Sequence, residues 1–236
     1  MSAFNFEIFL LKSNCAIKYR YYITTYYLNN LFFCCGMNST PHLELIIGTM
    51  YSGKSTELIR RVRRYEIAGL KCQLFKPAID DRYGLEHVAS HDDLRQEAMY
   101  VKDVGEIEQV LERDSRVIGI DEVQFLESEV VDFCNYQANQ GKIVVVAGLL
   151  KDFLDNPFSF KDKKKTMGDL VPFADHITYL KSICTYTDNG SICGHEATRV
   201  QRYVDGNVAA RDSPLVQVGG KEAYAPRCRE HFQFYV

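Results

Sequence analysis

The segment GTMYSGKS, residues 48–55, restricts the fold more than any other part of the chain. It fits the phosphate-loop pattern G-x-x-x-x-G-K-[ST], follows the strand-like run LELII (43–47) and precedes a helical segment that begins near Thr56. In such a loop the backbone N–H groups surround phosphate oxygens, Lys54 reaches the β and γ oxygens, and Ser55 ligates Mg²⁺. A chance match is a weak alternative because the strand and the helix are both in place. The segment therefore predicts a strand–loop–helix unit that binds a nucleotide.

A second part of a nucleotide site follows later in the chain. The apolar run RVIGI (116–120) leads into Asp121 and Glu122, and ligands of open α/β sheets bind at the carboxyl ends of the strands. Asp121 is placed to hold Mg²⁺ through water, and Glu122 is placed to accept a proton from the group that attacks the γ-phosphate. The alternative interpretation is a solvated strand end. The presence of a phosphate loop in the same chain favours the catalytic interpretation.

Strand-like runs alternate with amphipathic helical segments up to Leu180. The runs are rich in β-branched residues and bounded by Gly, Pro or Asp. The strand-like runs lie at 43–47, 72–76, 116–120, 143–147 and 176–180, and the helical segments at 56–69 and 127–141. This alternation predicts an α/β fold, a parallel sheet with helices on both faces. After Leu180, turns at 204–207 and 218–220 between short alternating segments predict a small β-rich appendage.

Composition limits the class of protein and its partners. The 236-residue chain is 46% hydrophobic with a net charge of −3, which suits one domain plus a smaller appendage and gives no general attraction for nucleic acid. No apolar run near the N-terminus reaches the ~18 residues of a membrane helix. Neither nucleic acid nor a membrane is therefore expected as a partner. The eight cysteines are too few for a disulfide scaffold, so reduced thiols and a cytoplasmic location are expected.

Residues 1–36 differ in composition from the rest, being rich in Tyr, Phe, Asn and Ile, and a second methionine, Met37, follows them. A disordered extension, a targeting piece and an upstream stretch not made in the cell are all compatible with this segment. The predicted organisation is an N-terminal extension over 1–36, an α/β ATP-binding domain over 37–181 and a zinc-binding domain over 182–236.

Four candidate metal ligands occur as two pairs near the C-terminus. They are Cys184, Cys193, Cys228 and His231. Thiolates and imidazole are ligands of tetrahedral Zn²⁺, and two pairs separated by a β segment are typical of ribbon-like structural sites. The first pair is wider than usual, so TYTDNGS between the two cysteines is expected to bulge out as a loop. His195 competes for the fourth position but lies only two residues after Cys193, so His231 is preferred.

Two classes of function are compatible with these motifs: a small-molecule kinase, and a nucleic-acid-dependent ATPase with a zinc ribbon. The arginines at 60–64 would suit the second class, but such a run is usually one solvated helix side whose arginines pair with acidic neighbours. A motor also needs a second ATPase-like lobe or a ring partner, whereas ~150 residues of α/β chain amount to about one domain. Size therefore favours the kinase.

From about Leu43 to the end, the sequence resembles the type II thymidine kinases, the cytosolic, zinc-containing family. The similar segments occur in one order: GTMYSGKSTELIRRVRRY, IDDRY, GIDEVQF, GLLKDFLDNPF, LVPFADHITYLKSIC, ATRVQRY and VQVGGKEAYAPRC. The resemblance implies a P-loop NTPase-type parallel sheet and a zinc-bearing lasso that closes as a lid. It also implies transfer of the γ-phosphate of ATP to the 5′-hydroxyl of thymidine, for DNA precursor synthesis, by a cytoplasmic homotetramer that uses ATP, Mg²⁺ and structural Zn²⁺.

The resemblance further implies roles for individual residues. Glu122 matches the general base of the family. The residues that match the ATP and Mg²⁺ site are Gly48, Thr49, Met50, Tyr51, Ser52, Gly53, Lys54, Ser55, Thr56, Arg82, Asp121, Glu122, Val123 and Gln124. The residues that match the nucleoside site are Met50, Phe125, Leu149, Phe153, Phe158, Thr198, Val216, Val218, Gly219 and Tyr224. Thr49, Tyr51 and Val123 depart from the residues usual in the family, and the β-branched Val123 narrows the backbone choices beside Glu122.

Overall fold

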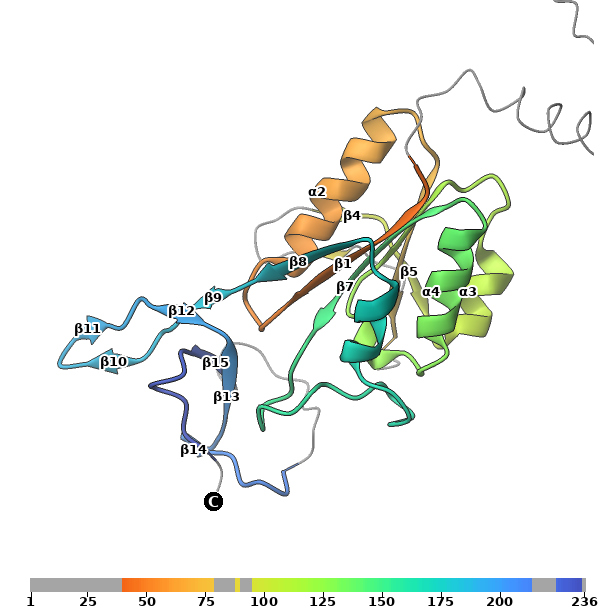
Figure 1. Cartoon of the computed structure of the whole chain (residues 1–236). Coiled ribbons are helices and arrows are strands. Elements are labelled where there is room, and N and C mark those ends of the chain that lie inside the picture. The colour runs from red at the N-terminus through yellow and green to blue at the C-terminus, as the bar shows by residue number, and fades with distance from the viewer. Residues whose placement is uncertain (1–39, 79–87, 90–94, 214–223, 235–236) are drawn as a thin grey trace, which may run out of the picture. The chain divides into compact units, whose positions relative to one another are not determined.

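The computed structural model describes residues 40–78, 88–89, 95–213 and 224–234 (Figure 1). Some predictions fall outside these residues. They are the extension at 1–36, the turn at 218–220, and the site residues Arg82, Val216, Val218 and Gly219. No helix within the described ranges has both the length and the apolar character needed to cross a bilayer.

A six-stranded sheet forms the centre of the fold, with strand order β5-β2-β6-β7-β1-β8 and parallel pairing between all neighbours. Its strands are β1 (His42–Gly48), β2 (Cys72–Pro77), β5 (Met99–Val101), β6 (Val117–Ile120), β7 (Ile143–Leu149) and β8 (His176–Leu180). The predicted parallel α/β sheet is confirmed. Strand β5 was not predicted, because three residues are too few for a clear pattern of alternation.

Helices cover both faces of this sheet, as predicted (Figure 1). Helix α2 (Lys54–Ile67) buries Leu58 and Val62 against one face, in a cluster with Leu74 of β2. Helices α3 (Val104–Val110) and α4 (Val130–Asn139) lie on the other face, where they join a second apolar cluster. Two short 3₁₀ helices, η1 (Val123–Phe125) and η2 (Met167–Phe173), complete the helical elements of the described chain.

Short antiparallel strands follow β8, as the sequence predicted. Strand β9 (Ser182–Ile183) pairs with β12 (Glu196–Ala197), and β10 (Thr187–Asp188) pairs with β11 (Ser191–Ile192). Strand β13 (Arg199–Val204) pairs with β14 (Asn207–Val208) and β15 (Tyr224–Arg227). A separate pair, β3 (Val88–Ala89) and β4 (Arg95–Gln96), precedes β5.

The parallel pairing decides where the functional residues meet. Strands β1, β6 and β7 end side by side, at Gly48, Ile120 and Leu149. The segments that follow them are the phosphate loop, the Asp121–Glu122 pair and the GLLKDF segment. All three therefore emerge at one edge of the sheet, where ligands of open α/β folds bind.

Candidate active site

The phosphate loop connects β1 to α2 through two positions that favour glycine. Gly53 adopts a φ of 82° immediately before the helix, a conformation without steric cost only for glycine. At Gly48, a Cβ atom would lie 2.3 Å from the backbone oxygen of Leu180 in β8. The glycines of the motif therefore serve the turn into the helix and the close approach of two strands.

Lys54 is buried at the start of α2, and its Nζ donates a hydrogen bond of 2.6 Å to the Thr49 backbone oxygen. Burial lowers the pKa of Lys54, while the carboxylates of Glu122 and Asp121 oppose this shift. The lysine thus lies across the loop from its first residues and close to both carboxylates. In P-loop proteins the lysine of the motif reaches the nucleotide phosphates.

Asp121 follows β6 and faces Ser55 of the phosphate loop. The Ser55 hydroxyl lies 3.0 and 2.9 Å from the two carboxylate oxygens, and Asp121 is only 1% exposed. Burial, together with the charge of Glu122, raises the pKa of Asp121 to about 6, against the opposing charge of Lys76 at 3.6 Å. A hydroxyl and a carboxylate, both hard oxygen donors, fit the ligand preference of Mg²⁺.

Glu122 has a left-handed backbone, with φ 50° and ψ 40°. For a residue other than glycine this conformation costs roughly 1–2 kcal/mol, and such strain is concentrated at functional sites. Val123, the departure noted in the sequence, lies in η1 and is completely buried in the apolar core. The unusual conformation therefore falls on Glu122, and Val123 is accommodated by apolar packing.

The predicted nucleoside-lining residues are divided between two apolar clusters. Leu149 and Phe158 belong to the main core cluster, against which Phe125 packs, and the rings of Phe125 and Phe158 meet edge to face at 5.9 Å. Phe153 and Tyr224 form a second cluster with Val200 of β13. Met50 of the phosphate loop packs against both clusters. Six of the predicted lining residues thus belong to these two clusters or pack against them, and Met50 of the phosphate loop is common to both.

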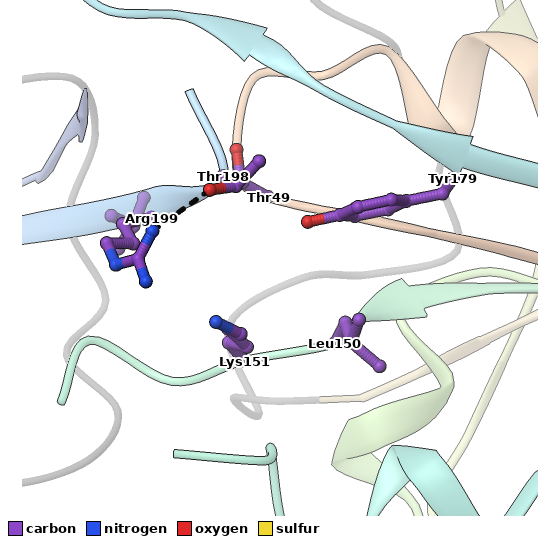
Figure 2. Close-up of a pocket in the computed structure, with 8 residues that line it drawn as sticks. Thr49, Leu150, Lys151, Tyr179, Thr198 and Arg199 are labelled. Carbon is purple, nitrogen blue, oxygen red and sulfur yellow. Dashed lines mark hydrogen bonds between the residues drawn. The ribbon is translucent and has the colours of Figure 1, made fainter. Parts of the chain in front are cut away.

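Thr198 lines a pocket beside the start of the phosphate loop (Figure 2). Its lining comes from the ends of β1, β7 and β8 and the start of β13. It consists of Gly48, Thr49, Leu150, Lys151, Tyr179, Thr198, Arg199 and Val200. Figure 2 shows Tyr179, Leu150 and Lys151 around the opening, with Thr49 and Thr198 at one side. Glu122 does not line this pocket.

Arg202 of β13 was not predicted, although it touches two predicted residues. Its side chain is 2% exposed, and its guanidinium lies over the Phe153 ring at 5.2 Å and the Tyr224 ring at 5.9 Å. Arg199 of the same strand pairs with Asp155 at 3.1 Å. Charged residues in a short strand are normally expected at the surface, so the sequence contained no clear signal for either contact.

The four predicted metal ligands converge on one point. The ligand atoms of Cys184, Cys193, Cys228 and His231 all lie within 4.8 Å of one another. His231 Nδ1 is 3.3 Å from the Cys228 sulfur, and the Cys193 and Cys228 sulfurs are 4.0 Å apart. Zinc–ligand bonds of ~2.3 Å in a tetrahedron place two sulfurs about 3.8 Å apart, so this cluster fits Zn²⁺. His195 is not part of it.

A hairpin closes the wide spacing between the first two cysteines. The segment that was expected to bulge out forms the β10–β11 pair, whose turn residues Asn189 and Gly190 have φ values of 48° and 83°. Two successive positive φ values define the type I′ turn that joins twisted strands.

Burial raises the pKa of the Cys184 thiol, but hydrogen bonds from the Cys228 and Tyr186 backbone and from His231 outweigh burial and lower the pKa to about 7. A thiol of this kind ionises readily for metal binding.

Two arginines of the run in α2 pair with acidic neighbours. Arg60 and Arg61 both donate hydrogen bonds to Glu57, at 2.6 and 2.7 Å, and Arg61 also pairs with the buried Glu44 of β1. This agrees with the interpretation of the run as a salt-bridged helix side.

Comparison with known proteins agrees with the resemblance to thymidine kinases seen in the sequence. The sequence profile of the family described as Thymidine kinase matches residues 41–232. A thymidine kinase of Thermococcus kodakarensis is 46% identical over 200 residues, covering 83% of this chain and 95% of that protein. Among solved structures, the Legionella pneumophila ATPase DotB has only a weak similarity, with a TM-score of 0.37 and 15% identity over 66% of this chain and 44% of that chain. The family match extends from the phosphate loop to the Cys/His cluster, and the chain belongs to the thymidine kinase family.

Proposed function

We propose that this protein transfers the γ-phosphate of ATP to the 5′-hydroxyl of thymidine, giving dTMP and ADP. The observation that carries the proposal is the position of Glu122 next to the Ser55–Asp121 pair. A carboxylate that lies one residue beyond the metal-binding position can accept a proton without ligating the metal. Family membership supports thymidine as the acceptor and ATP as the donor.

In the proposed mechanism, the loop N–H groups and Lys54 bind the β- and γ-phosphates, and Ser55 and Asp121 would hold Mg²⁺. The metal, when bound, neutralises part of the phosphate charge. Glu122 takes the proton of the 5′-hydroxyl while the 5′-oxygen of thymidine forms a bond to the γ-phosphorus. The bond between the γ-phosphorus and the ADP oxygen breaks on the opposite side. The remaining residues of the phosphate loop would contact the nucleotide, mainly through their backbone, with Arg82 near the transferred phosphate.

The nucleoside would lie against the apolar residues grouped around Met50. Flat aromatic and aliphatic side chains suit a pyrimidine ring, while backbone groups read its polar edge. Thr198 and the lid segment that includes Val216, Val218 and Gly219 are proposed to supply this second kind of contact. Tyr224 would complete the site near the sugar.

The Cys/His cluster is proposed to bind one structural Zn²⁺. Its four ligands leave no open position for a substrate, which is the arrangement of structural sites. Residues 182–236 would then form a lid whose base is fixed by the metal. The hydroxyl of Ser182, at the start of this segment, donates a 3.2 Å hydrogen bond to the Tyr51 backbone oxygen of the phosphate loop. Ordering of the lid and of the nucleotide loop would therefore be linked.

A cytoplasmic homotetramer is proposed for the assembled enzyme. Strand β8 is an outer strand of the described sheet, and Ile177 and Tyr179 on it are 46% and 41% exposed, near the exposed Phe173 of η2. An exposed strand edge with apolar side chains is a frequent site of association. Light scattering after size exclusion should give four chains for the native protein and fewer for Ile177→Lys, with Ile67→Lys on α2 as the matched exposed control.

The test of the reaction is Glu122→Gln. We expect turnover to fall by at least about 100-fold, the range typical of a removed general base, while ATP binding measured by calorimetry is retained. Phosphate transfer is to be measured with thymidine and, in parallel, with single-stranded DNA. Near-normal turnover of Glu122→Gln would contradict the assignment of the base, and stimulation by DNA alone would contradict thymidine kinase activity.

A further inference from the structure

Gln124 is a buried amide with both ends of its side chain in hydrogen bonds. It lies in η1, two residues after Glu122, and is 1% exposed. Its Nε2 donates to Glu122 Oε2 at 2.6 Å, and its Oε1 accepts from the Leu149 backbone N–H at 3.0 Å. A backbone N–H can only donate, so Oε1 must face Leu149. The NH₂ group is consequently directed at the Glu122 carboxylate, and the amide orientation is fixed by chemistry.

Two features of the backbone make this arrangement possible. The left-handed conformation of Glu122 and the 3₁₀ turn after it bring the side chains of Glu122 and Gln124 together. In β7, a Cβ atom at Gly148 would lie 2.6 Å from Gln124 Oε1 and 2.7 Å from Met167 Cε. Only glycine at this strand position leaves space for the amide. The chain thus provides room and a turn for one buried polar side chain that contacts the proposed base.

The charges around Glu122 explain why a neutral donor is useful there. Asp121 is adjacent in sequence and repels the Glu122 carboxylate, whereas the nearby Lys54 attracts it. Phosphates bound at Lys54 would change this balance during turnover. A hydrogen bond from an uncharged amide holds the carboxylate in one orientation without adding to the net charge of the site.

We propose that Gln124 is a positioning residue that fixes the Glu122 carboxylate relative to the end of β7, where Leu149 contributes to the predicted nucleoside site. The proposal rests on the proposed role of Glu122 as general base. Gln124 acts through Glu122, and it also links Glu122 to β7, the strand that ends at Leu149 of the predicted nucleoside site. Misplacement of a reacting group by about 1 Å costs on the order of 100-fold in rate, so a fixed orientation of this carboxylate has a large effect.

The test compares four variants of the full-length zinc-bound protein: Gln124→Met, Gln124→Glu, Glu122→Gln and the double variant Glu122→Gln/Gln124→Met. Methionine keeps the side-chain length but removes both hydrogen bonds, whereas glutamate keeps the acceptor for Leu149 and, once ionised, loses the donor to Glu122 and places a second negative charge beside it. We expect kcat to fall by about 100-fold in both single Gln124 variants, with KM for ATP changed less than about 2-fold. Melting temperature and zinc content are measured for every variant.

The double variant separates a positioning role from an independent one. If Gln124 acts through Glu122, the added Gln124→Met change lowers kcat by less than about 2-fold in the Glu122→Gln background. An equal loss in both backgrounds, or a rise in KM for ATP with unchanged kcat, would overturn the proposal in favour of direct nucleotide binding. Wild-type kcat in Gln124→Glu, measured at a pH at which both carboxyl groups are ionised, would also overturn it, even if Gln124→Met fails to fold. Normal kcat in Glu122→Gln would instead reject the base itself.

Discussion

The Ser55 hydroxyl lies within 3.0 Å of both carboxylate oxygens of Asp121, and this contact joins the phosphate loop to the end of β6. The two residues are 66 positions apart in sequence. Their contact depends on the parallel sheet, in which β7 lies between β1 and β6. The two proposed Mg²⁺-binding groups are therefore positioned together by the fold, which leads to the first prediction.

Replacement of Ser55 by alanine should weaken the response to Mg²⁺. Loss of the hydroxyl removes one proposed ligand and also releases the buried Asp121. We expect the Mg²⁺ concentration for half-maximal activity to rise by roughly 10- to 100-fold, as measured by magnesium titration at saturating ATP and thymidine. Ser55→Thr, which keeps a hydroxyl, should remain close to the parent. An unchanged magnesium requirement in Ser55→Ala would contradict this assignment.

The zinc prediction is tested by changing ligands from both pairs. We expect about one Zn²⁺ per chain in the parent protein and little in Cys193→Ser/His231→Ala, as measured by plasma mass spectrometry. The matched control is Cys72→Ser, because burial raises the pKa of the Cys72 thiol to about 12 and this residue lies outside the cluster. The control should keep its zinc. Full zinc retention by the double variant would show that the ligands are elsewhere.

Glu44 should make the stability of the protein depend on pH. Burial raises the pKa of Glu44, but hydrogen bonds from Tyr65, His42 and Arg61 outweigh burial and lower the pKa below its ordinary value of 4.5. A lowered pKa in the folded state stabilises the protein above the unfolded-state pKa, and this contribution is lost as the pH falls through the folded-state pKa.

At pH 7, Glu44→Gln should therefore lower the free energy of unfolding by about 1–3 kcal/mol, as measured by urea denaturation. The difference from the parent should shrink as the pH falls below 4.5, the ordinary pKa of a glutamate carboxyl. Glu112→Gln, at an exposed ion pair with Lys71, serves as the control and should change stability by less than about 1 kcal/mol. A constant Glu44→Gln difference between pH 7 and pH 3.5 would contradict the pKa direction.

Arg202 should affect nucleoside binding through the rings of Phe153 and Tyr224. A desolvated cation–π contact is worth about 1 kcal/mol or more, so Arg202→Met should raise KM for thymidine by roughly 5-fold with little change in KM for ATP. Steady-state kinetics with each substrate varied measure both constants. The control is Arg64→Met on the exposed side of α2. Equal changes in both KM values would indicate a general structural effect instead.

Local sequence patterns predicted much of the fold. The phosphate loop, five of the sheet strands and helices α2 and α4 follow from spacing and residue type, because each is specified by neighbours along the chain. Helix α3 was missed, although Asp103 caps it by accepting a hydrogen bond from the Glu106 N–H at 2.8 Å. A helix of seven residues is too short for its apolar periodicity to be recognised in the sequence. The cysteines and His231 were predictable because few side chains other than thiols and imidazoles bind zinc.

Tertiary structure decided how these residues are oriented. The amide of Gln124 meets the Leu149 N–H across a sequence separation of 25 residues. Arg202 of β13 lies over the ring of Phe153, which is in the segment that follows β7. Neither contact has a local pattern, because a buried polar side chain finds its partners through packing between distant segments. The sequence alone determined which chemical groups the protein has and which elements carry them. The parallel sheet, which brings the ends of distant strands to one edge, decided which of these groups touch.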